Sequence, residues 1–282
     1  NNMIKPMLAY KVGKKDVDWS EKVFMQPKLD GVRCVIQLDK NKNVIAYSRT
    51  GKPWLNISHI LKSLKPWFIM HPTMILDGEL YNHDLKDDFE QIISLVRKQK
   101  PTPYMRSKAK KLVQFHCYDY AHTNEPYSQR MRNLSTSDFY SYCVKYVPTF
   151  QVTDSAHANF KHKNFLDRGF EGSILRLDKI YECKRSYSLQ KFKDFHDAEA
   201  VIVGYEAGKG KREGTLGKFI MQDEDGIEFG CPPGKGFTYK DLAKIQNNIH
   251  DYIGEIATFT YFERTKAGSY RHPMFKCLRN YE

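Results

Sequence analysis

Apolar and polar residues alternate in strand-like and helix-like patterns over the first two thirds of the chain. Apolar runs at 33–38 and 44–47 flank the polar segment 39–43, and this pattern predicts two strands joined by a turn. Within 88–98, apolar residues recur at helical spacing and predict a helix. The same patterns predict a strand over 112–118, a helix that begins at Pro126, and a helix over 155–168 that ends at Gly169. This mixture indicates an α+β fold.

The pattern changes after residue 193, where short strands alternate with glycine-rich turns. Thr238 and Asp241 have the spacing of a capping box, so a helix is predicted over 238–249. Strands are predicted over 198–204, 217–222, 226–229 and 256–262. Several short strands with one helix suit a small OB-type β-barrel. With 282 residues, about two domains are expected, and we place the boundary near 194–197. The predicted domains are 1–194 and 195–282.

The composition favours a globular protein with a polyanionic partner. Apolar residues make up 41% and charged residues 28%, and no apolar run is long enough to span a bilayer. The net charge of +12 favours nucleic acid, with a membrane surface a distant second, because no strongly basic amphipathic helix is visible. The six cysteines form no CxxC pair, which argues against a local zinc site and fits a reducing compartment.

One short segment carries the strongest chemical signal. Lys28, Asp30, Gly31 and Arg33 lie between two apolar runs. A free lysine titrates near ~10.4 and becomes a nucleophile only when its pKa is lowered. Gly31 permits a tight turn and a close backbone approach, and Arg33 offers a planar fork for a phosphate or a ribose. Taken alone, a solvated lysine beside an ordinary turn is an equally good interpretation.

Six further segments follow this one in a fixed order. The seven segments read MQPKLDGVR (25–33), SRTGK (48–52), LDGELY (76–81), FHCYDY (115–120), EGSILR (171–176), SLQKFK (188–193) and YFERTKAGSYRHPMFKCLR (261–279). Together they cover nearly the whole chain and resemble the covalent nucleotidyltransferases, specifically the small ATP-dependent DNA ligases of viruses and phages. The resemblance implies an adenylation domain of antiparallel sheets with flanking helices, followed by a small β-barrel OB-fold domain.

The resemblance makes Lys28 the residue that becomes covalently bound to AMP. Lys191 and Lys193 are two residues apart, so on a strand both side chains point to one face. There they could bind the α-phosphate and lower the pKa of Lys28 by like-charge repulsion. The alternative is an exposed strand with two solvated lysines.

The resemblance also implies roles in nucleotide binding. Glu79 would accept hydrogen bonds from the ribose hydroxyls, although a turn acid at a strand edge is the alternative. Arg33 would contact ribose and phosphate. Arg49 would bind the ribose or the 5′-phosphate of a nick, since a guanidinium suits either.

The base would lie between two side chains. Tyr118 would stack on one face of adenine and Ile174 would cover the other, and a tyrosine can stack as well as the phenylalanine that many ligases carry. The backbone of Gln26 would recognise the adenine amino group. Phe115 and Tyr120 can equally be ordinary core aromatics.

Two acidic residues are the candidate metal ligands. The resemblance assigns Glu171 to Mg²⁺ (or Mn²⁺), with Asp30 assisting at the same centre, because a hard divalent cation prefers carboxylate and phosphate oxygens. In the last segment, Arg279 would orient the pyrophosphate leaving group. The family usually continues with an acid and a lysine that Asn280-Tyr281-Glu282 does not supply, so Arg271 or Lys276 is an alternative.

The sequence therefore predicts an ATP-dependent DNA ligase that seals 3′-hydroxyl/5′-phosphate nicks in duplex DNA. Its predicted cofactors are ATP and Mg²⁺, its partner is nicked double-stranded DNA without a membrane, and it is expected to be a monomer. The expected location is cytoplasmic or nucleoid-associated, or the host-cell cytoplasm for a virus or phage.

Three alternatives stay open. An mRNA-capping guanylyltransferase shares the lysine motif, but the run 197–206 after the lysine pair is ligase-like. An RNA ligase is a second alternative. A non-catalytic basic OB protein would coat nucleic acid, but it would have no reason to carry Lys28, Glu79, Glu171 and Lys191 in this order.

Overall fold

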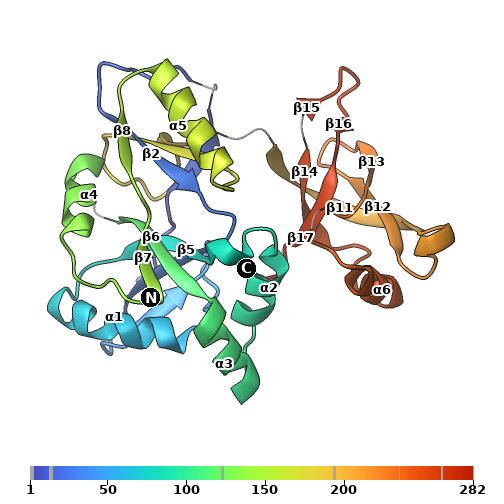
Figure 1. The fold of residues 1–282 in the computed structure, drawn as a ribbon, viewed down its shortest axis with the longest axis horizontal. Helices are drawn as coiled ribbons and strands as arrows, with labels where there is room; N and C mark the ends of the chain where they lie inside the picture. The colour runs from blue at the N-terminus through green and yellow to red at the C-terminus, as the bar shows by residue number, and fades with distance from the viewer. Residues whose placement is uncertain are drawn as a thin grey trace. The chain divides into compact units, whose positions relative to one another are not determined.

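A computed structural model describes residues 3–12, 15–121, 124–192, 195–234, 236–261 and 263–281. The chain divides into two compact units, one comprising Asn1–Lys193 with Glu282 and the other Asp194–Tyr281 (Figure 1). The predicted boundary near 194–197 lies next to this division. The predicted bounds of the adenylation domain (1–194) and of the OB-fold domain (195–282) stay predictions.

The first unit contains two five-stranded sheets. One sheet has the order β1-β10-β9-β2-β8, with β1 (Leu8–Lys11), β10 (Arg185–Phe192), β9 (Gly172–Leu177), β2 (Val23–Lys28) and β8 (Phe150–Val152). The other has the order β4-β3-β5-β6-β7, with β4 (Val44–Tyr47), β3 (Val32–Leu38), β5 (Leu76–Tyr81), β6 (Gln114–Tyr120) and β7 (Val144–Tyr146). Both sheets are antiparallel apart from the parallel pairs β1–β10 and β6–β7. The predicted antiparallel α+β architecture is confirmed.

Helices cover these sheets. They are α1 (Ser58–Met70), η1 (His83–Leu85), α2 (Phe89–Val96), α3 (Pro103–Leu112), α4 (Tyr127–Ser135) and α5 (Ser155–Asp167). The helix α5 packs against β2 and β9, and Figure 1 shows it along the sheet that contains β2 and β8. On this face Val23, Met25 and Leu175 form a core with Phe165. The opposite face of the sheet is therefore available for polar side chains, because alternate residues of a strand point to opposite sides.

The predicted helices of this unit are present. Asp88 caps α2 by accepting a hydrogen bond from the Gln91 backbone N–H. The helix α5 is followed by Gly169 at φ +86°, the left-handed conformation that glycine adopts without strain. The helices α1 and α3 were not predicted.

The second unit is built on one sheet of order β13-β12-β11-β14-β17. Its elements are β11 (His196–Ala207), η2 (Gly210–Arg212), β12 (Leu216–Gln222), β13 (Glu228–Cys231), α6 (Tyr239–Asn247), η3 (Ile249–Asp251), β14 (Ile256–Tyr261), the hairpin β15 (Glu263–Arg264) and β16 (Tyr270–Arg271), and β17 (Met274–Leu278). The capping box at Thr238 and Asp241 is confirmed.

The second unit has the antiparallel sheet of the predicted OB-type domain, but among the described residues no continuous ladder between its edge strands β13 and β17 closes the sheet into a barrel. Across the gap between β13 and β17, the part of the chain that the structure describes shows a single bridge, from Pro233 to Phe275. The strand β13 ends at Cys231 and leads into Pro232 and Pro233, which have no N–H to extend a ladder of hydrogen bonds.

In the described residues no helix is long and apolar enough to cross a membrane.

Candidate active site

Lys28 is the last residue of β2 and lies opposite Gly172, the first residue of β9. This register brings its ammonium to the preceding residue, Glu171, with Nζ 3.1 Å from Oε2. The two side chains are 18% and 21% exposed, so the pair is accessible from solvent. The structure thus joins two predicted site residues that are 143 positions apart in the sequence.

Three strands carry a row of predicted site residues next to this pair. Gln26 on β2 lies opposite Ile174 on β9, and Ile174 lies opposite Lys191 on β10. Residues opposite one another in register point to the same face of a sheet, and Lys28 shares that face with Gln26 because it is two residues further on. The row therefore faces away from α5. Lys193 lies outside the described residues, so the paired effect of two lysines on Lys28 stays a prediction.

The second sheet contributes Glu79 and Tyr118. The Tyr118 hydroxyl donates a hydrogen bond of 3.1 Å to Glu79 Oε1 across β5 and β6. Burial raises the pKa of Glu79 from 4.5 to about 7, and the positive charges of Arg33 and Lys28 oppose the rise. Glu79 therefore lies within electrostatic reach of Lys28, and its carboxyl group changes charge near neutral pH.

Asp30 and Glu171 lie within electrostatic reach of the Tyr81 hydroxyl. Burial raises the pKa of Tyr81, and the nearby charges of Asp30 and Glu171 raise it further. Among the described residues, no group of three or more His, Cys, Asp or Glu side chains could hold a metal ion. A pair of carboxylates nevertheless fits Mg²⁺, which is usually held by one or two carboxylates together with substrate phosphates and water.

Arg33 is held within the protein. Its Nε and Nη2 donate to both carboxylate oxygens of Asp77 at 2.6 Å, and Nη2 also donates to the Met7 carbonyl at 2.7 Å. These bonds fix the guanidinium 5.5 Å from the centre of the Tyr118 ring. The sequence indicated the position of Arg33 at the site but not its partner Asp77, which is 1% exposed and lies in the LDGELY segment.

Arg49 lies in the turn that follows β4. The buried Ser48 organises this turn, since its side chain accepts hydrogen bonds from the backbone N–H groups of Thr50 and Lys52. The antiparallel register pairs Val35 with Tyr47, so continuing it places the turn at the level of Arg33. Arg49 is thus at the site end of the second sheet, and its contact with ribose or phosphate stays a prediction.

Tyr118 and Ile174 pack against different groups of residues. Tyr118 contacts the cluster of Leu29, Tyr81 and Val147, whereas Ile174 contacts the cluster of Met7, Tyr181 and Leu189. Both side chains are partly exposed. Their roles on the two faces of adenine stay predictions.

Gly31 is required by packing. A Cβ atom at this position would lie 2.3 Å from the Leu80 carbonyl oxygen and 3.2 Å from Glu79 Oε2. The close approach that the sequence suggested is therefore to β5, and any side chain at Gly31 would push the Lys28 segment away from Glu79.

A buried polar cluster lies behind the site and was not predicted. We call Gln26, Asp119, Arg130 and Arg176 the Asp119 cluster. Asp119 accepts hydrogen bonds from Arg130 (2.7 and 3.1 Å) and from Arg176 (2.8 Å), and Arg176 also donates to Gln26 Oε1 at 2.7 Å. All four residues are at most 2% exposed. Arg176 and Asp119 belong to the recognised segments EGSILR and FHCYDY, which was the one available signal.

The Asp119 cluster fixes the Gln26 side chain. The Gln26 amide donates to the Tyr118 carbonyl at 3.1 Å, to the Tyr127 hydroxyl at 2.8 Å and to Thr149 Oγ1 at 2.9 Å. The cluster therefore ties β2 and β9 of one sheet to β6 of the other, beside the positions expected to bind the base.

The predicted residues of the last segment lie in the second unit. Arg279 forms an ion pair with Glu199 (Nε to Oε1, 3.0 Å) and donates to the Tyr281 hydroxyl. Arg271 lies on β16 and Lys276 on β17. Which of these cations orients pyrophosphate stays a prediction.

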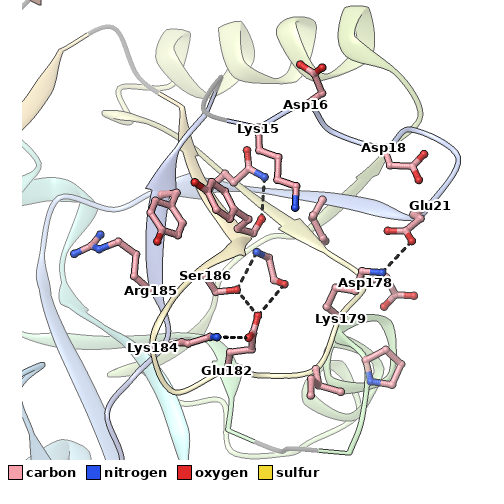
Figure 2. A pocket seen from close by; sticks show the side chains of 17 residues that line it. Lys15, Asp16, Asp18, Glu21, Asp178, Lys179, Glu182, Lys184, Arg185 and Ser186 are labelled. Atoms are coloured by element: carbon pink, nitrogen blue, oxygen red, sulfur yellow. Dashed lines mark hydrogen bonds and ion pairs between the residues drawn. The ribbon is translucent and has the colours of Figure 1, made fainter.

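A cavity of about 820 Å³ lies elsewhere in the first unit (Figure 2). It contains none of the predicted site residues, and two of its cations form ion pairs with acids, Lys179 with Glu21 (2.9 Å) and Lys184 with Glu182 (3.4 Å). Figure 2 shows both pairs among the side chains that line the cavity. Volume alone does not make this cavity the active site, because the convergent cations and acids expected for nucleotide chemistry lie around Lys28.

Sequence comparison places both units in known families. A family model described as ATP dependent DNA ligase domain matches residues 6–193, and one described as DNA ligase OB-like domain matches residues 207–279. The DNA ligase of African swine fever virus (isolate Pig/Kenya/KEN-50/1950) is 28% identical over 212 residues, covering 68% of this chain and 47% of the relative. The DNA ligase of Enterobacteria phage T4 is 25% identical over 303 residues, covering 89% and 62%. The chain spans about half the length of the curated relatives it matches.

Solved structures share the fold. Chlorella virus DNA ligase-adenylate is 25% identical with a TM-score of 0.52, and 98% of each chain is covered. A Lig E DNA ligase is 23% identical with a TM-score of 0.57, covering 98% of this chain and all of the other. Since the first family model covers more than half of the sequence, the chain belongs to the family of the ATP dependent DNA ligase domain.

Proposed function

We propose that this chain is an ATP-dependent DNA ligase that seals 3′-hydroxyl/5′-phosphate nicks in duplex DNA through an AMP group carried on Lys28. The observation that carries the proposal is the Lys28–Glu171 pair at the end of β2, beside the Gln26–Ile174–Lys191 row and within reach of Glu79. Family membership, and relatives that are DNA ligases, support the same activity.

In the first step, the Lys28 Nζ lone pair attacks the α-phosphorus of ATP. An N–P bond forms, the bond to pyrophosphate breaks, and the amine proton passes to solvent. A neighbouring carboxylate stabilises the ammonium form of a lysine, whereas attack requires the neutral amine. Glu171 must therefore release Lys28 before the reaction, and Lys191, which lies on the same face, would bind the phosphate.

In the second step, an oxygen of the nick's 5′-phosphate attacks the phosphorus of the Lys28 adduct. The N–P bond breaks, and AMP is transferred to the DNA. In the third step, the 3′-hydroxyl attacks the activated 5′-phosphate, a phosphodiester forms and AMP leaves. Positioning and charge neutralisation account for most of the catalysis in such transfers.

Asp30 and Glu171 are the residues that would hold a divalent cation. Bound there, Mg²⁺ would neutralise phosphate charge and compete with Lys28 for the Glu171 carboxylate. The carboxyl group of Glu79, once ionised, would accept hydrogen bonds from the ribose hydroxyls. We further propose that the protein acts as a monomer, and in the host-cell cytoplasm if its source resembles its viral and phage relatives.

The test is incubation of the chain with α-labelled ATP or GTP and Mg²⁺, followed by denaturing electrophoresis. We expect label from ATP on the wild type and none on Lys28→Ala. A label from GTP alone would favour a capping enzyme, and no label would leave a non-catalytic nucleic-acid-binding protein. Label on Lys28→Ala would assign the nucleophile to another residue.

A second experiment addresses the sealing steps. A nick that already carries AMP on its 5′-phosphate is supplied without ATP, and sealing is expected. A continued requirement for ATP would contradict the three-step scheme. Comparison with a nick in an RNA duplex separates a DNA ligase from an RNA ligase.

A further inference from the structure

The helix α3 and the loop before it form a strongly basic surface. We call Arg97, Lys98, Lys100, Arg106, Lys108, Lys110 and Lys111 the α3 basic patch. Between residues 91 and 112 the sequence contains these seven cations and no acidic residue. Like charges three or four residues apart on a helix repel each other. Each such pair, for example Arg106 and Lys110, destabilises the helix by about 0.2–0.5 kcal/mol.

The α3 basic patch faces solvent. Of the ten residues of α3, only Ala109 is fully buried, and Arg106, Lys110 and Lys111 are exposed. Among the described residues, none of the seven cations forms an ion pair, and Arg106 donates one hydrogen bond, to the Pro101 carbonyl at 2.9 Å. The charges are thus concentrated on one surface and are not balanced within the described part of the protein.

The backbone of this segment is nevertheless held in place. Thr102 caps α3 by accepting a hydrogen bond from the Met105 N–H at 3.2 Å. The buried Asn56 donates to the carbonyls of Leu95 at 3.1 Å and Met105 at 3.3 Å, which joins the end of α2 to α3. A fixed helix presents its cations in a constant geometry.

The helix α3 ends beside the candidate active site. Asn82 donates to the Leu112 carbonyl at 3.0 Å, and the next strand begins with Gln114 opposite Tyr81. Tyr81 follows Leu80, whose carbonyl lies directly against Gly31 in the segment that contains Lys28. At 1.5 Å per residue the helix extends about 15 Å from this edge.

We propose that the α3 basic patch binds the sugar-phosphate backbone of the DNA duplex beside the nick. The proposal rests on the proposed function, since it needs the nick to lie at Lys28. The cations are complementary to phosphates, and their contacts release counterions from the duplex. A membrane surface fits less well, because α3 lacks the continuous apolar face of an interfacial helix.

The experiment compares charge-neutralised variants of the full chain. Lys110→Gln/Lys111→Gln removes two cations of the patch, and Lys98→Gln/Lys100→Gln removes two from the loop before α3. The matched control is Lys40→Gln/Lys42→Gln. These lysines are exposed in the turn between β3 and β4, at the opposite end of the same sheet. Thermal unfolding checks the fold of each protein.

Affinity for a nicked duplex is measured by fluorescence anisotropy at several salt concentrations. For either patch variant we expect binding about tenfold weaker near 0.1 M salt and a slope of log K against log salt that is smaller by about 2. The control keeps the wild-type affinity and slope. Unchanged binding in both patch variants, or an equal loss in the control, would overturn the proposal.

Two further measurements separate this proposal from others. Vesicles containing anionic phospholipid are tested in parallel, and binding to them that exceeds binding to the duplex and depends on the patch would overturn the assignment to DNA. Labelling of Lys28 by ATP is measured separately. A chain that binds the duplex through the patch but takes no label would refute the ligase activity and not the surface.

Discussion

Two polar side chains on β2, those of Lys28 and Gln26, have surroundings of opposite kinds. Lys28 meets the carboxylate of Glu171 at 3.1 Å, and both side chains are about one fifth exposed. Gln26 belongs to the Asp119 cluster, where buried hydrogen bonds of 2.7–3.1 Å connect four side chains. The first group can exchange partners when a nucleotide or cation arrives, whereas the second cannot exchange partners without exposing buried charge. Lys28, at the end of the strand, can change partners, whereas Gln26, two residues earlier, is held rigidly.

The most severe test of this contrast is Asp119→Ala. It leaves Arg130 and Arg176 buried without their carboxylate, and we expect a loss of about 3–5 kcal/mol in the free energy of unfolding. Urea denaturation measures the change. The control is Glu21→Ala, which breaks the exposed Lys179–Glu21 pair and should leave the free energy of unfolding nearly unchanged, because solvent screens the two charges. Equal losses of stability in the two variants would contradict the distinction between the fixed Asp119 cluster and exposed ion pairs that can exchange partners.

Glu79→Gln tests a carboxyl group of intermediate burial. Because the pKa of Glu79 is about 7 in the folded protein and near 4.5 when unfolded, the folded state binds more protons between these values. Wild-type stability therefore falls as pH rises from 4.5 to about 7 and stays lower above it. We expect Glu79→Gln to be more stable than wild type by about 2–3 kcal/mol at pH 8, with no gain below pH 4.5. Urea midpoints across pH measure this, and a gain that did not vary with pH would contradict it.

Glu171→Gln tests the exchangeable group. Gln keeps an acceptor for Lys28 but removes the charge that a divalent cation needs, so we expect nick sealing to fall about 10- to 100-fold. The free energy of unfolding should change by less than about 1 kcal/mol. The measurement is the sealing rate across a Mg²⁺ titration. A titration curve indistinguishable from wild type would exclude the metal role.

Tyr118→Phe is expected to have the smallest effect. The Tyr118 hydroxyl lowers the pKa of Glu79 by its hydrogen bond, so its removal raises that pKa above about 7. If ionised Glu79 binds ribose, the pH at which ATP labelling is half-maximal should rise by up to about one unit. The pH profile of Lys28 labelling measures the shift, and Tyr181→Phe, whose hydroxyl donates to Asp77, is the control. A shift to lower pH would show that Glu79 is not the titrating group.

The sequence predicted those elements whose signals are local. The strands β3 and β4 and the capping box of α6 depend on alternation or spacing within a few residues. The helix α1 contains Pro66, which argues against a helix, and α3 buries only Ala109 and so shows no apolar stripe. The parallel pairing of β1 with β10 joins residues about 180 positions apart, which no local pattern encodes.

The residues of the candidate site likewise divide into those with a local sequence signal and those without one. Ordered segments indicated Lys28, Glu79 and Glu171, because each segment carries its own chemical residue. The side chains that pair with residues of these segments could not be predicted from local sequence. Arg33 meets Asp77 only after β3 and β5 have paired, across 44 positions of sequence. Arg176 meets Asp119 only after the two sheets have packed together, across 57 positions.

The absence of a side chain at Gly31 has a further consequence. The loop that follows the nucleophile lies directly on the carbonyl of Leu80, closer than any Cβ would permit. The distance between the Lys28 amine, the proposed nucleophile, and Glu79, the acid proposed to hold the sugar, is thus set during folding. Bringing two separate groups together would cost entropy in every catalytic cycle. Here that entropy is lost once, when the chain folds.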